Sequence, residues 1–355
     1  GSGTLAVGAG TLRMDAGGTA GTREITLAGG GLIQVYDGAG FDNATMTLGG
    51  GTLDFRATTT MAKGVTLTAS ATFSANTPSG AAVATVATMS GYLTTTARSK
   101  VIVNGNGQLR LAGGGNFIGS GEIFVQGGGD LTIVSNEVTV TGYAGLESGG
   151  KRFAVADGGT FSMTGNNVNL HAGMGAGDCS FEVLTGGVYN VSSGVNLMIG
   201  NGCNNLFLIR GGTVNVANGG QFLLGNSAAS TGTIELDAGG VLKSSRQLKV
   251  GATGGYGAVV FNGGTLQSDG ANTYDPWVAA NIAVSVGSAG GTISAQGLAM
   301  KLGSSGLSGA GALTLAGGGS VAFSQSSTNW TGGLTLDAGT AVASVSNALG
   351  TGTVT

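Results

Sequence analysis

Few residues in this chain of 355 can carry chemistry. The only cysteines, Cys179 and Cys203, are 24 residues apart, and His171 is the single histidine. Cysteines that stack in neighbouring layers of a β-structure have Cα atoms about 4.8 Å apart, which suits a disulfide. We therefore predict a Cys179–Cys203 disulfide, with two separate thiols as the alternative. A metal site is disfavoured, because His171 alone cannot complete a tetrahedral ligand set.

A catalytic role for His171 finds no support in the sequence. A nucleophilic triad needs a serine and a carboxylate placed around the imidazole, and no such arrangement can be read from the surrounding residues. We interpret His171 as a loop residue. We expect no catalytic residue, no metal and no cofactor in this chain, and we do not expect it to be an enzyme.

Carboxylates offer the main alternative to this interpretation. Enzymes that cleave polysaccharides need several carboxylates, or basic residues beside calcium-binding aspartates, on one exposed face. Glu235 and Asp237 alternate on one expected strand and so share a face, but the 17 acidic residues are spread over the whole chain. We interpret them as a solvated face, and keep a carbohydrate-binding module, lyase or hydrolase as the second hypothesis.

One stretch is rich in aromatic residues. Tyr274, Asp275 and Trp277 lie together in SDGANTYDPWVAAN, residues 268–281, beside one of the two prolines. Exposed tyrosine and tryptophan can stack on a sugar or dock a partner, so these three residues are a candidate surface contact. The alternative is that Trp277 folds back as a lid on the core.

Composition excludes several classes of protein. Glycine accounts for 74 residues, proline for 2 and charged residues for only 9%, while hydrophobic residues reach 41%. The glycines do not recur at every third residue, which excludes collagen. A net charge of −3 without a basic cluster disfavours nucleic acid as a partner. No apolar run approaches the roughly 20 residues of a membrane helix. A repetitive all-β protein with many turns remains.

A repeat runs through the chain. The second residue after a turn glycine is apolar or aromatic at twelve positions, and Phe73 takes the same place after Ala71. These thirteen positions are spaced about 26 residues apart on average, and at twelve of them the next residue is polar. These positions are Leu12, Ile33, Leu53, Phe73, Leu109, Leu131, Phe161, Tyr189, Val214, Leu242, Leu266, Ile293 and Val321. The alternation predicts a strand with one buried and one wet face at the same place in every repeat. Asn190 and Asn215 would occupy matching outward positions and form a side-chain ladder.

This pattern predicts an all-β fold, a right-handed parallel β-helix (β-solenoid) of about 13–14 coils of roughly 26 residues. Residues 1–355 would form one continuous solenoid, a segment of a longer protein. Insertions are expected near residues 77–100, 136–157 and 268–281, where the pattern breaks; such insertions usually form loops, which are common binding sites in solenoids.

The last fifty residues carry a family resemblance. Gly309–Leu315 (GAGALTL), Trp330–Thr340 (WTGGLTLDAGT) and Ser346–Thr355 (SNALGTGTVT) resemble the autotransporter-associated β-strand repeat, also called the passenger-associated transport repeat. Val259–Leu266 (VVFNGGTL) is a looser copy. The resemblance implies a right-handed β-helix that is secreted and displayed on or beyond a bacterial outer membrane. That oxidising setting would favour the disulfide.

The sequence and the resemblance together predict a structural or adhesive segment of a bacterial surface protein. Its expected location is extracellular or on the cell surface. Its expected partners are neighbouring β-helix segments, or copies of itself stacked end to end, and surface glycans. Neither nucleic acid nor insertion of this segment into a membrane is expected.

Overall fold

The structure is a computed structural model that describes residues 3–355, except residues 16, 22, 37–43, 82, 97–98, 114–116, 120, 148, 166–168, 175–178 and 271–276, and except the side chains of 117–119 and 172–174. The described residues form strands and turns and no helix. Their 41 strands stack in parallel as a β-solenoid of about 13 turns. The predicted fold class and the approximate number of coils are therefore confirmed.

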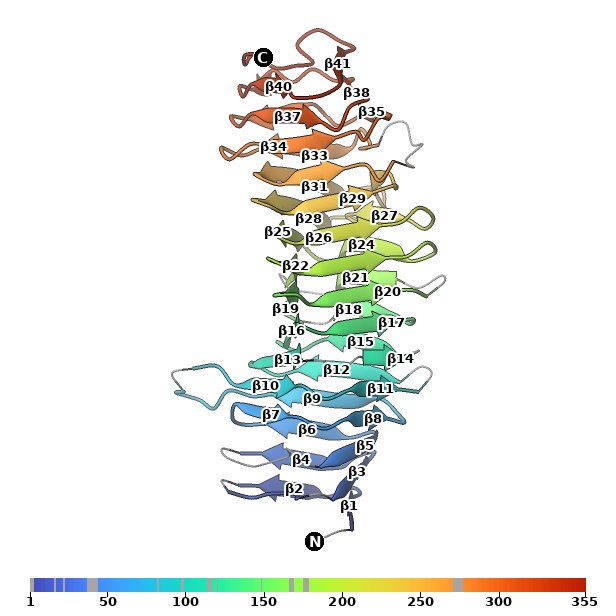
Figure 1. The fold of residues 1–355 in the computed structure, drawn as a ribbon, viewed down its shortest axis with the longest axis vertical. Helices are drawn as coiled ribbons and strands as arrows, with labels where there is room; N and C mark the ends of the chain where they lie inside the picture. The colour runs from blue at the N-terminus through green and yellow to red at the C-terminus, as the bar shows by residue number, and fades with distance from the viewer. Residues whose placement is uncertain are drawn as a thin grey trace. The chain divides into compact units, whose positions relative to one another are not determined.

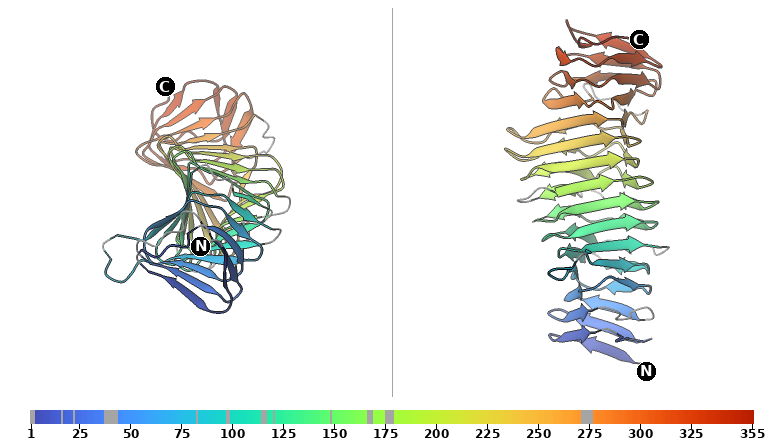
Figure 2. Two further views of the ribbon diagram at one scale, coloured as in Figure 1. Left: turned by 60° about the horizontal axis from the view of Figure 1, so that its bottom comes forward. Right: turned by 90° about the vertical axis from the view of Figure 1, so that its left-hand side faces the viewer.

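The chain divides into two compact units, Gly1–Val168 and Asn169–Thr355. In each unit the strands of successive coils form three parallel sheets, here called A, B and C (Figures 1 and 2). The prediction of one continuous solenoid stays a prediction.

The strands of unit 1 follow a regular order. Sheet A contains β1 (Thr4–Val7), β3 (Glu24–Ala28), β5 (Thr45–Gly49), β8 (Val65–Leu67), β11 (Leu93–Thr95), β14 (Phe117–Gly119), β17 (Glu137–Val140) and β20 (Thr160–Met163). Sheet B contains β2 (Thr11–Met14), β4 (Leu32–Val35), β6 (Thr52–Phe55), β9 (Ala71–Ala75), β12 (Lys100–Asn104), β15 (Glu122–Val125) and β18 (Ala144–Glu147). Sheet C contains β7 (Thr59–Met61), β10 (Val86–Met89), β13 (Gln108–Ala112), β16 (Asp130–Val134) and β19 (Arg152–Ala156).

Unit 2 repeats this arrangement. Sheet A contains β23 (Val188–Val191), β26 (Thr213–Val216), β29 (Val241–Ser244), β32 (Thr265–Gln267), β34 (Gly291–Ser294), β37 (Leu313–Ala316) and β40 (Leu334–Leu336). Sheet B contains β21 (Asn169–Met174), β24 (Asn196–Asn201), β27 (Phe222–Leu224) and β30 (Leu248–Val250), followed by β35 (Ala299–Leu302), β38 (Ser320–Phe323) and β41 (Thr340–Ala343). Sheet C contains β22 (Cys179–Val183), β25 (Asn205–Arg210), β28 (Thr231–Asp237), β31 (Tyr256–Asn262), β33 (Ile282–Val286), β36 (Leu307–Gly309) and β39 (Asn329–Trp330).

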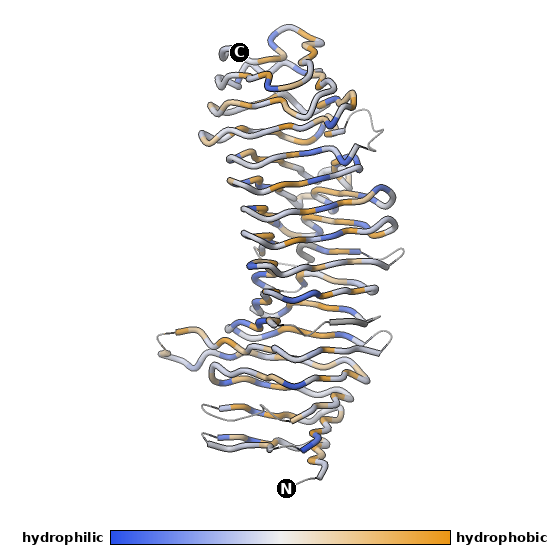
Figure 3. Tube along the Cα trace, in the orientation of Figure 1, coloured by the Kyte–Doolittle hydropathy of each residue, from blue (hydrophilic) through white to orange (hydrophobic). Residues whose placement is uncertain are grey.

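Apolar and polar residues alternate along the strands, as Figure 3 shows. Twelve of the thirteen predicted inward positions are buried, and only Leu12 is partly exposed. They do not form one column, however. Leu53 lies in sheet B, Leu131 in sheet C and Val214 in sheet A. A turn followed by an alternating strand occurs on every side of the coil. The mean spacing of about 26 residues was therefore taken between strands of different sheets. The true step varies, from Thr4 paired with Glu24 to Ala71 paired with Val101.

Aromatic side chains fill part of the core of unit 2. The ring centroids of Phe181 and Phe207, on neighbouring rungs of sheet C, are 5.3 Å apart in an edge-to-face arrangement. Tyr189 of sheet A packs against both of them, with its centroid 5.2 Å from that of Phe181. Edge-to-face contacts of this kind add stability beyond that of apolar burial. These aromatic contacts therefore connect sheet A with sheet C through the core of this unit.

Close backbone stacking explains one column of glycines in unit 2. A Cβ added to Gly311, Gly332 or Gly352 would overlap the carbonyl oxygen of the equivalent glycine one coil earlier. The buried indole of Trp330 donates its N–H to the Gly311 carbonyl oxygen at 2.9 Å and occupies the space beside Gly332. The Trp-Thr-Gly-Gly sequence at 330–333 thus encodes a tryptophan that fits only because Gly332, two residues later, has no side chain.

The structure modifies the predicted insertions. Residues 136–157 contain β17, β18 and β19, one strand for each sheet, and so form a regular coil in place of the expected insertion. Residues 77–100 contain β10 and β11, and only the exposed loop before β10 departs from the coil. Residues 271–276 of the aromatic insertion lie outside the described residues. The described residues include no helix that is both long and apolar enough to cross a membrane.

The glycine column leads to a stability prediction. Gly332→Ala should lower the free energy of unfolding by about 1–3 kcal/mol, because the added methyl group overlaps a backbone oxygen that cannot move without its rung. Gly10→Ala is the matched control, since a Cβ there meets no atom within 4 Å. Guanidinium denaturation followed by circular dichroism measures both. An equal loss for the two variants would contradict the close stacking at Gly332.

Candidate functional site

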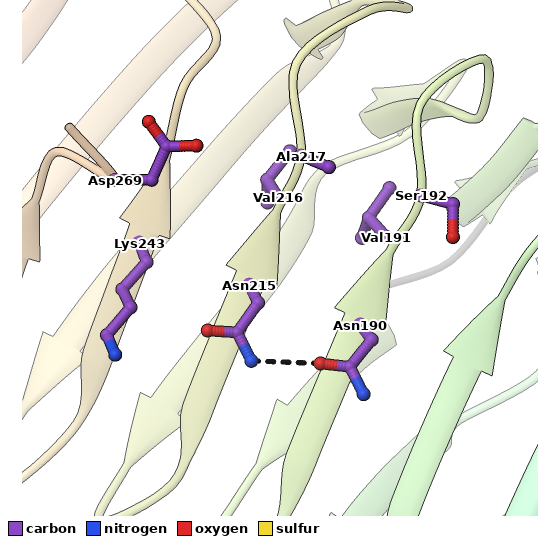
Figure 4. A pocket seen from close by; sticks show the side chains of 8 residues that line it. All are labelled: Asn190, Val191, Ser192, Asn215, Val216, Ala217, Lys243 and Asp269. Carbon is purple, nitrogen blue, oxygen red and sulfur yellow. Dashed lines mark hydrogen bonds between the residues drawn. The ribbon is translucent and has the colours of Figure 1, made fainter. Parts of the chain in front are cut away.

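A groove lies on the outer face of sheet A in unit 2 (Figure 4). It is open to solvent and has a volume of about 310 Å³. It is lined by Asn190, Val191, Ser192, Asn215, Val216, Ala217, Lys243 and Asp269. We call it the asparagine groove.

Three consecutive strands place its polar side chains. Asn190 on β23 pairs in register with Asn215 on β26, which pairs with Lys243 on β29. Their neighbours Tyr189 and Val214 are fully buried, so strand alternation turns the three polar side chains outward. The groove thus presents one polar group on each rung, at intervals of about 4.8 Å.

The predicted asparagine ladder is confirmed. Asn215 Nδ2 donates a hydrogen bond to Asn190 Oδ1 at 2.9 Å, drawn as the dashed line in Figure 4. Within the described part of the chain, Asn215 Oδ1 accepts no hydrogen bond and the Lys243 ammonium has no hydrogen-bond or ion-pair partner. An acceptor and a cationic donor on adjacent rungs therefore face solvent.

A buried arginine shapes this groove. Arg246 is 1% exposed, and its guanidinium donates to the carbonyl oxygens of Ala217 at 2.6 Å, Ser192 at 2.8 Å and Val195 at 2.5 Å. The carbonyls belong to the two preceding turns, so Arg246 holds three turns together. Ser245 is buried with it, which leaves the turn after β29 recessed behind the exposed turn at Ala217.

The Arg246 cation also acts on the core. Burial raises the pKa of the Tyr189 hydroxyl well above its usual range, and the nearby guanidinium lowers it only in part. Tyr189 is therefore neutral, and the backbone carbonyls stabilise the buried cation. Our sequence analysis missed Arg246. The available signal was that the strand register places Arg246 where the two preceding turns carry Ser193 and Asn218, two small polar residues.

Glu235 and Asp237 lie on the outer face of sheet C, on β28. Asp237 is only 5% exposed, so the solvated face predicted for the pair does not extend to it. Burial alone would raise the pKa of Asp237, but hydrogen bonds from Arg210 Nε at 2.6 Å and Asn262 Nδ2 at 2.9 Å hold it below its usual value. Burial, and then the Asp237 charge, raise the pKa of Glu235. The pair is an ionised carboxylate beside a more easily protonated one.

A buried aspartate in unit 1 is satisfied by side chains of its own and neighbouring coils. Asp54, buried on the outer side of sheet B, accepts hydrogen bonds from Arg56 at 2.6 Å, Asn76 at 2.7 Å and Gln34 at 3.3 Å. Every one of these donors lies on the same rung or on a neighbouring one. This cluster stabilises the ladder and has no carboxylate oxygen left to act on a substrate.

The two cysteines lie close together at the edge of sheet C. Cys179 is paired in register with Asn205, and not with Cys203, and both cysteines are thiols in this structure. Their sulfur atoms contact the same Asn205 Oδ1, at 2.6 Å and 3.6 Å, which bounds the separation of the two sulfurs at 6.2 Å. The disulfide stays a prediction; forming it requires the Asn205 side chain to move aside.

His171 lies in strand β21 and not in the predicted loop. Its Nδ1 is 3.2 Å from Asn201 Nδ2, and burial lowers its pKa. Over the described residues, no group of three or more histidine, cysteine, aspartate and glutamate side chains is placed to hold a metal ion. His171 therefore has a structural role as a neutral side chain bonded to an amide.

The candidate aromatic contact changes most. Trp277 is fully buried, so it is not a surface contact, and the alternative of a residue folded onto the core describes it. Its backbone N–H donates to the Lys301 carbonyl oxygen and its carbonyl accepts from the Leu248 N–H. Trp277 and the following Val278 thus form the rung between β30 and β35. Tyr274 and Asp275 lie outside the described residues.

Comparisons with known proteins add little to this description. No protein-family model matches the sequence, and a search of curated proteins gives no match. Among solved structures, the chain is similar to the TibC-catalyzed hyper-glycosylated TibA55-350 fragment, with 18% sequence identity and a TM-score of 0.32. The match covers 82% of this chain and 97% of that fragment. Functional arguments must therefore come from the residues of this chain.

The first prediction from this site concerns Arg246. Arg246→Met should lower the free energy of unfolding by more than about 3 kcal/mol, because several buried carbonyl oxygens lose their donor at once. Lys63→Met, at an exposed position, is the control and should change stability by less than about 0.5 kcal/mol. Urea denaturation measures both. A small loss for Arg246→Met would show that these carbonyls find other donors.

The second prediction concerns pH. The lowered pKa of Asp237 gives stability that is present above its unfolded value of about 4 and is lost as the pH falls through the lower folded value. The raised pKa of Glu235 instead costs stability above its unfolded value.

Asp237→Asn should therefore lower the melting temperature at neutral pH and have a smaller effect at acidic pH. Glu235→Gln should raise the melting temperature at neutral pH, and this gain should also shrink in acid. Calorimetric melting curves from acidic to neutral pH test the pair, and shifts of the same sign at neutral pH would contradict the assignment.

Proposed function

We propose that this chain is a structural, adhesive segment of a secreted bacterial surface protein. The supporting observation is the in-register ladder of sheets A and C inside each unit, which packs against an apolar core and turns polar residues to solvent. Such a fold can be lengthened coil by coil without changing its cross-section, because each coil contacts only its neighbours. The function is geometric: the coils hold outward-facing side chains in a fixed row.

The location follows from the resemblance of residues 309–355 to the passenger-associated transport repeat. In this region β36, β37, β39 and β40 continue the ladders of sheets A and C. We place the segment on the bacterial surface or outside the cell. No enzymatic step forms part of the proposal, and the Asp54 carboxylate of unit 1 accepts hydrogen bonds from its neighbours in the ladder.

Partners of the same architecture fit the last coil. Leu336, Val342, Val345 and Val354 are each at least 40% exposed there, beside the outer edge of β41 and the segment 353–355 that pairs with β40. A further coil, from a neighbouring segment or a second copy, would bury these side chains and pair the edges. Sedimentation velocity over a range of concentrations tests the second copy: a monomer at every concentration would leave only the neighbouring segment.

Protease treatment of intact cells tests the surface role. In the bacterium that produces this chain, an antibody to it should label intact cells or the culture medium. External protease should remove the cell-bound label while a cytoplasmic marker survives. Label that appears only after cell lysis, and that resists external protease, would refute the proposal.

A further inference from the structure

The asparagine groove marks a departure from the regular coil. Its recessed turn exists because Arg246 is directed into the protein, and its rim includes Asp269, which belongs to the stretch 268–281 that the sequence marks as an insertion. A buried cation is costly in a coil repeat, and Asp269 lies where the sequence departs from the repeat. Here they border the same hollow.

The chemistry of the groove is that of polyol recognition. Asn190 and Asn215 supply carboxamides, which both donate and accept hydrogen bonds, Lys243 supplies a donor and Asp269 an acceptor. One positive and one negative charge leave the lining close to neutral. Vicinal hydroxyl groups also donate and accept at once, so they match such a lining better than an anion or a cation does.

The geometry favours a chain molecule laid along the solenoid axis. Asn190, Asn215 and Lys243 stand on three consecutive rungs in register, about 4.8 Å apart. A pyranose oligomer advances by a similar distance per sugar ring, so successive rings can each meet one polar side chain. Asn215 Oδ1, in the middle of this row, and Lys243 Nζ, at its end, have no partner among the described residues.

We propose that the asparagine groove binds a neutral oligosaccharide lengthwise, with Asn215 accepting a hydrogen bond from a sugar hydroxyl and Lys243 donating one. This site is independent of the proposed surface role, because binding is a property of the isolated chain. The open groove makes few contacts with each sugar, so affinity should increase from the monosaccharide to the trisaccharide, as the three rungs are filled.

Titration calorimetry of the whole chain tests the proposal. The probes are cellohexaose, maltohexaose and mannohexaose, with a galacturonate hexamer as the acidic counterpart. We expect at least one neutral oligomer to bind at millimolar concentration or below. Lys243→Ala and Asn215→Ala should each weaken that binding about tenfold, the loss expected for one hydrogen bond. Lys63→Ala, at an exposed lysine in unit 1, should bind as the unchanged protein does.

Three results would overturn the proposal: no neutral oligomer binds, only the acidic hexamer binds, or both groove variants bind as Lys63→Ala does. Melting temperatures show whether each variant is folded. Asn215→Ala removes one member of the ladder, and if it fails to fold, Lys243→Ala decides alone, because the Lys243 amine contributes no hydrogen bond to the described fold.

Discussion

The in-register parallel ladder is the constraint on which every other feature of this protein depends. A backbone amide in a central strand is satisfied only by the coils before and after it, so each coil must copy the path of its neighbour. Side chains at equivalent positions are then forced into columns. The columns explain the buried aromatic cluster around Phe181, the asparagine pair of the groove and the carboxylate network at Asp54. In each case, side chains on neighbouring coils contact one another because the ladder brings them into register.

Stacking also decides where glycine is required. At the corner of Gly311, Gly332 and Gly352 the backbones approach so closely that no side chain fits, and the Trp330 indole takes the space that remains. The same tightness explains why Arg246 has such an effect. An arginine in the turn of a coil must be either buried or extended into solvent. Here four backbone carbonyl oxygens accept hydrogen bonds from the guanidinium of Arg246, which allows it to be buried. The recess that results is the main hollow of sheet A in unit 2.

The sequence predicted the fold well because alternation and turn glycines report the local environment of a strand. Positions such as Leu53, Leu131 and Val214 are buried as expected. The sequence failed to distinguish the three sides of a coil, since all of them follow the same rule, and it therefore joined residues of different sheets into one repeat. The Asn190–Asn215 ladder was predictable, because both residues are equally placed on strands of one sheet. The burial of Arg246 was not predicted, and that of Trp277 was foreseen only as an alternative, because a buried charge and a one-residue rung depend on partners far away in the chain.

The Arg246 side chain links three coils, which limits the segments of this region that can be duplicated or deleted during evolution. Its guanidinium contacts a turn one coil back, at Ala217, and another two coils back, at Ser192 and Val195. Each coil of a solenoid normally contacts only its two neighbours, so the duplication or loss of a single coil changes only those two interfaces. Between Ser192 and Arg246 such a change would alter which carbonyls meet the buried cation. This part of the chain is therefore expected to be inherited as a block of three coils, and the groove that it supports with it.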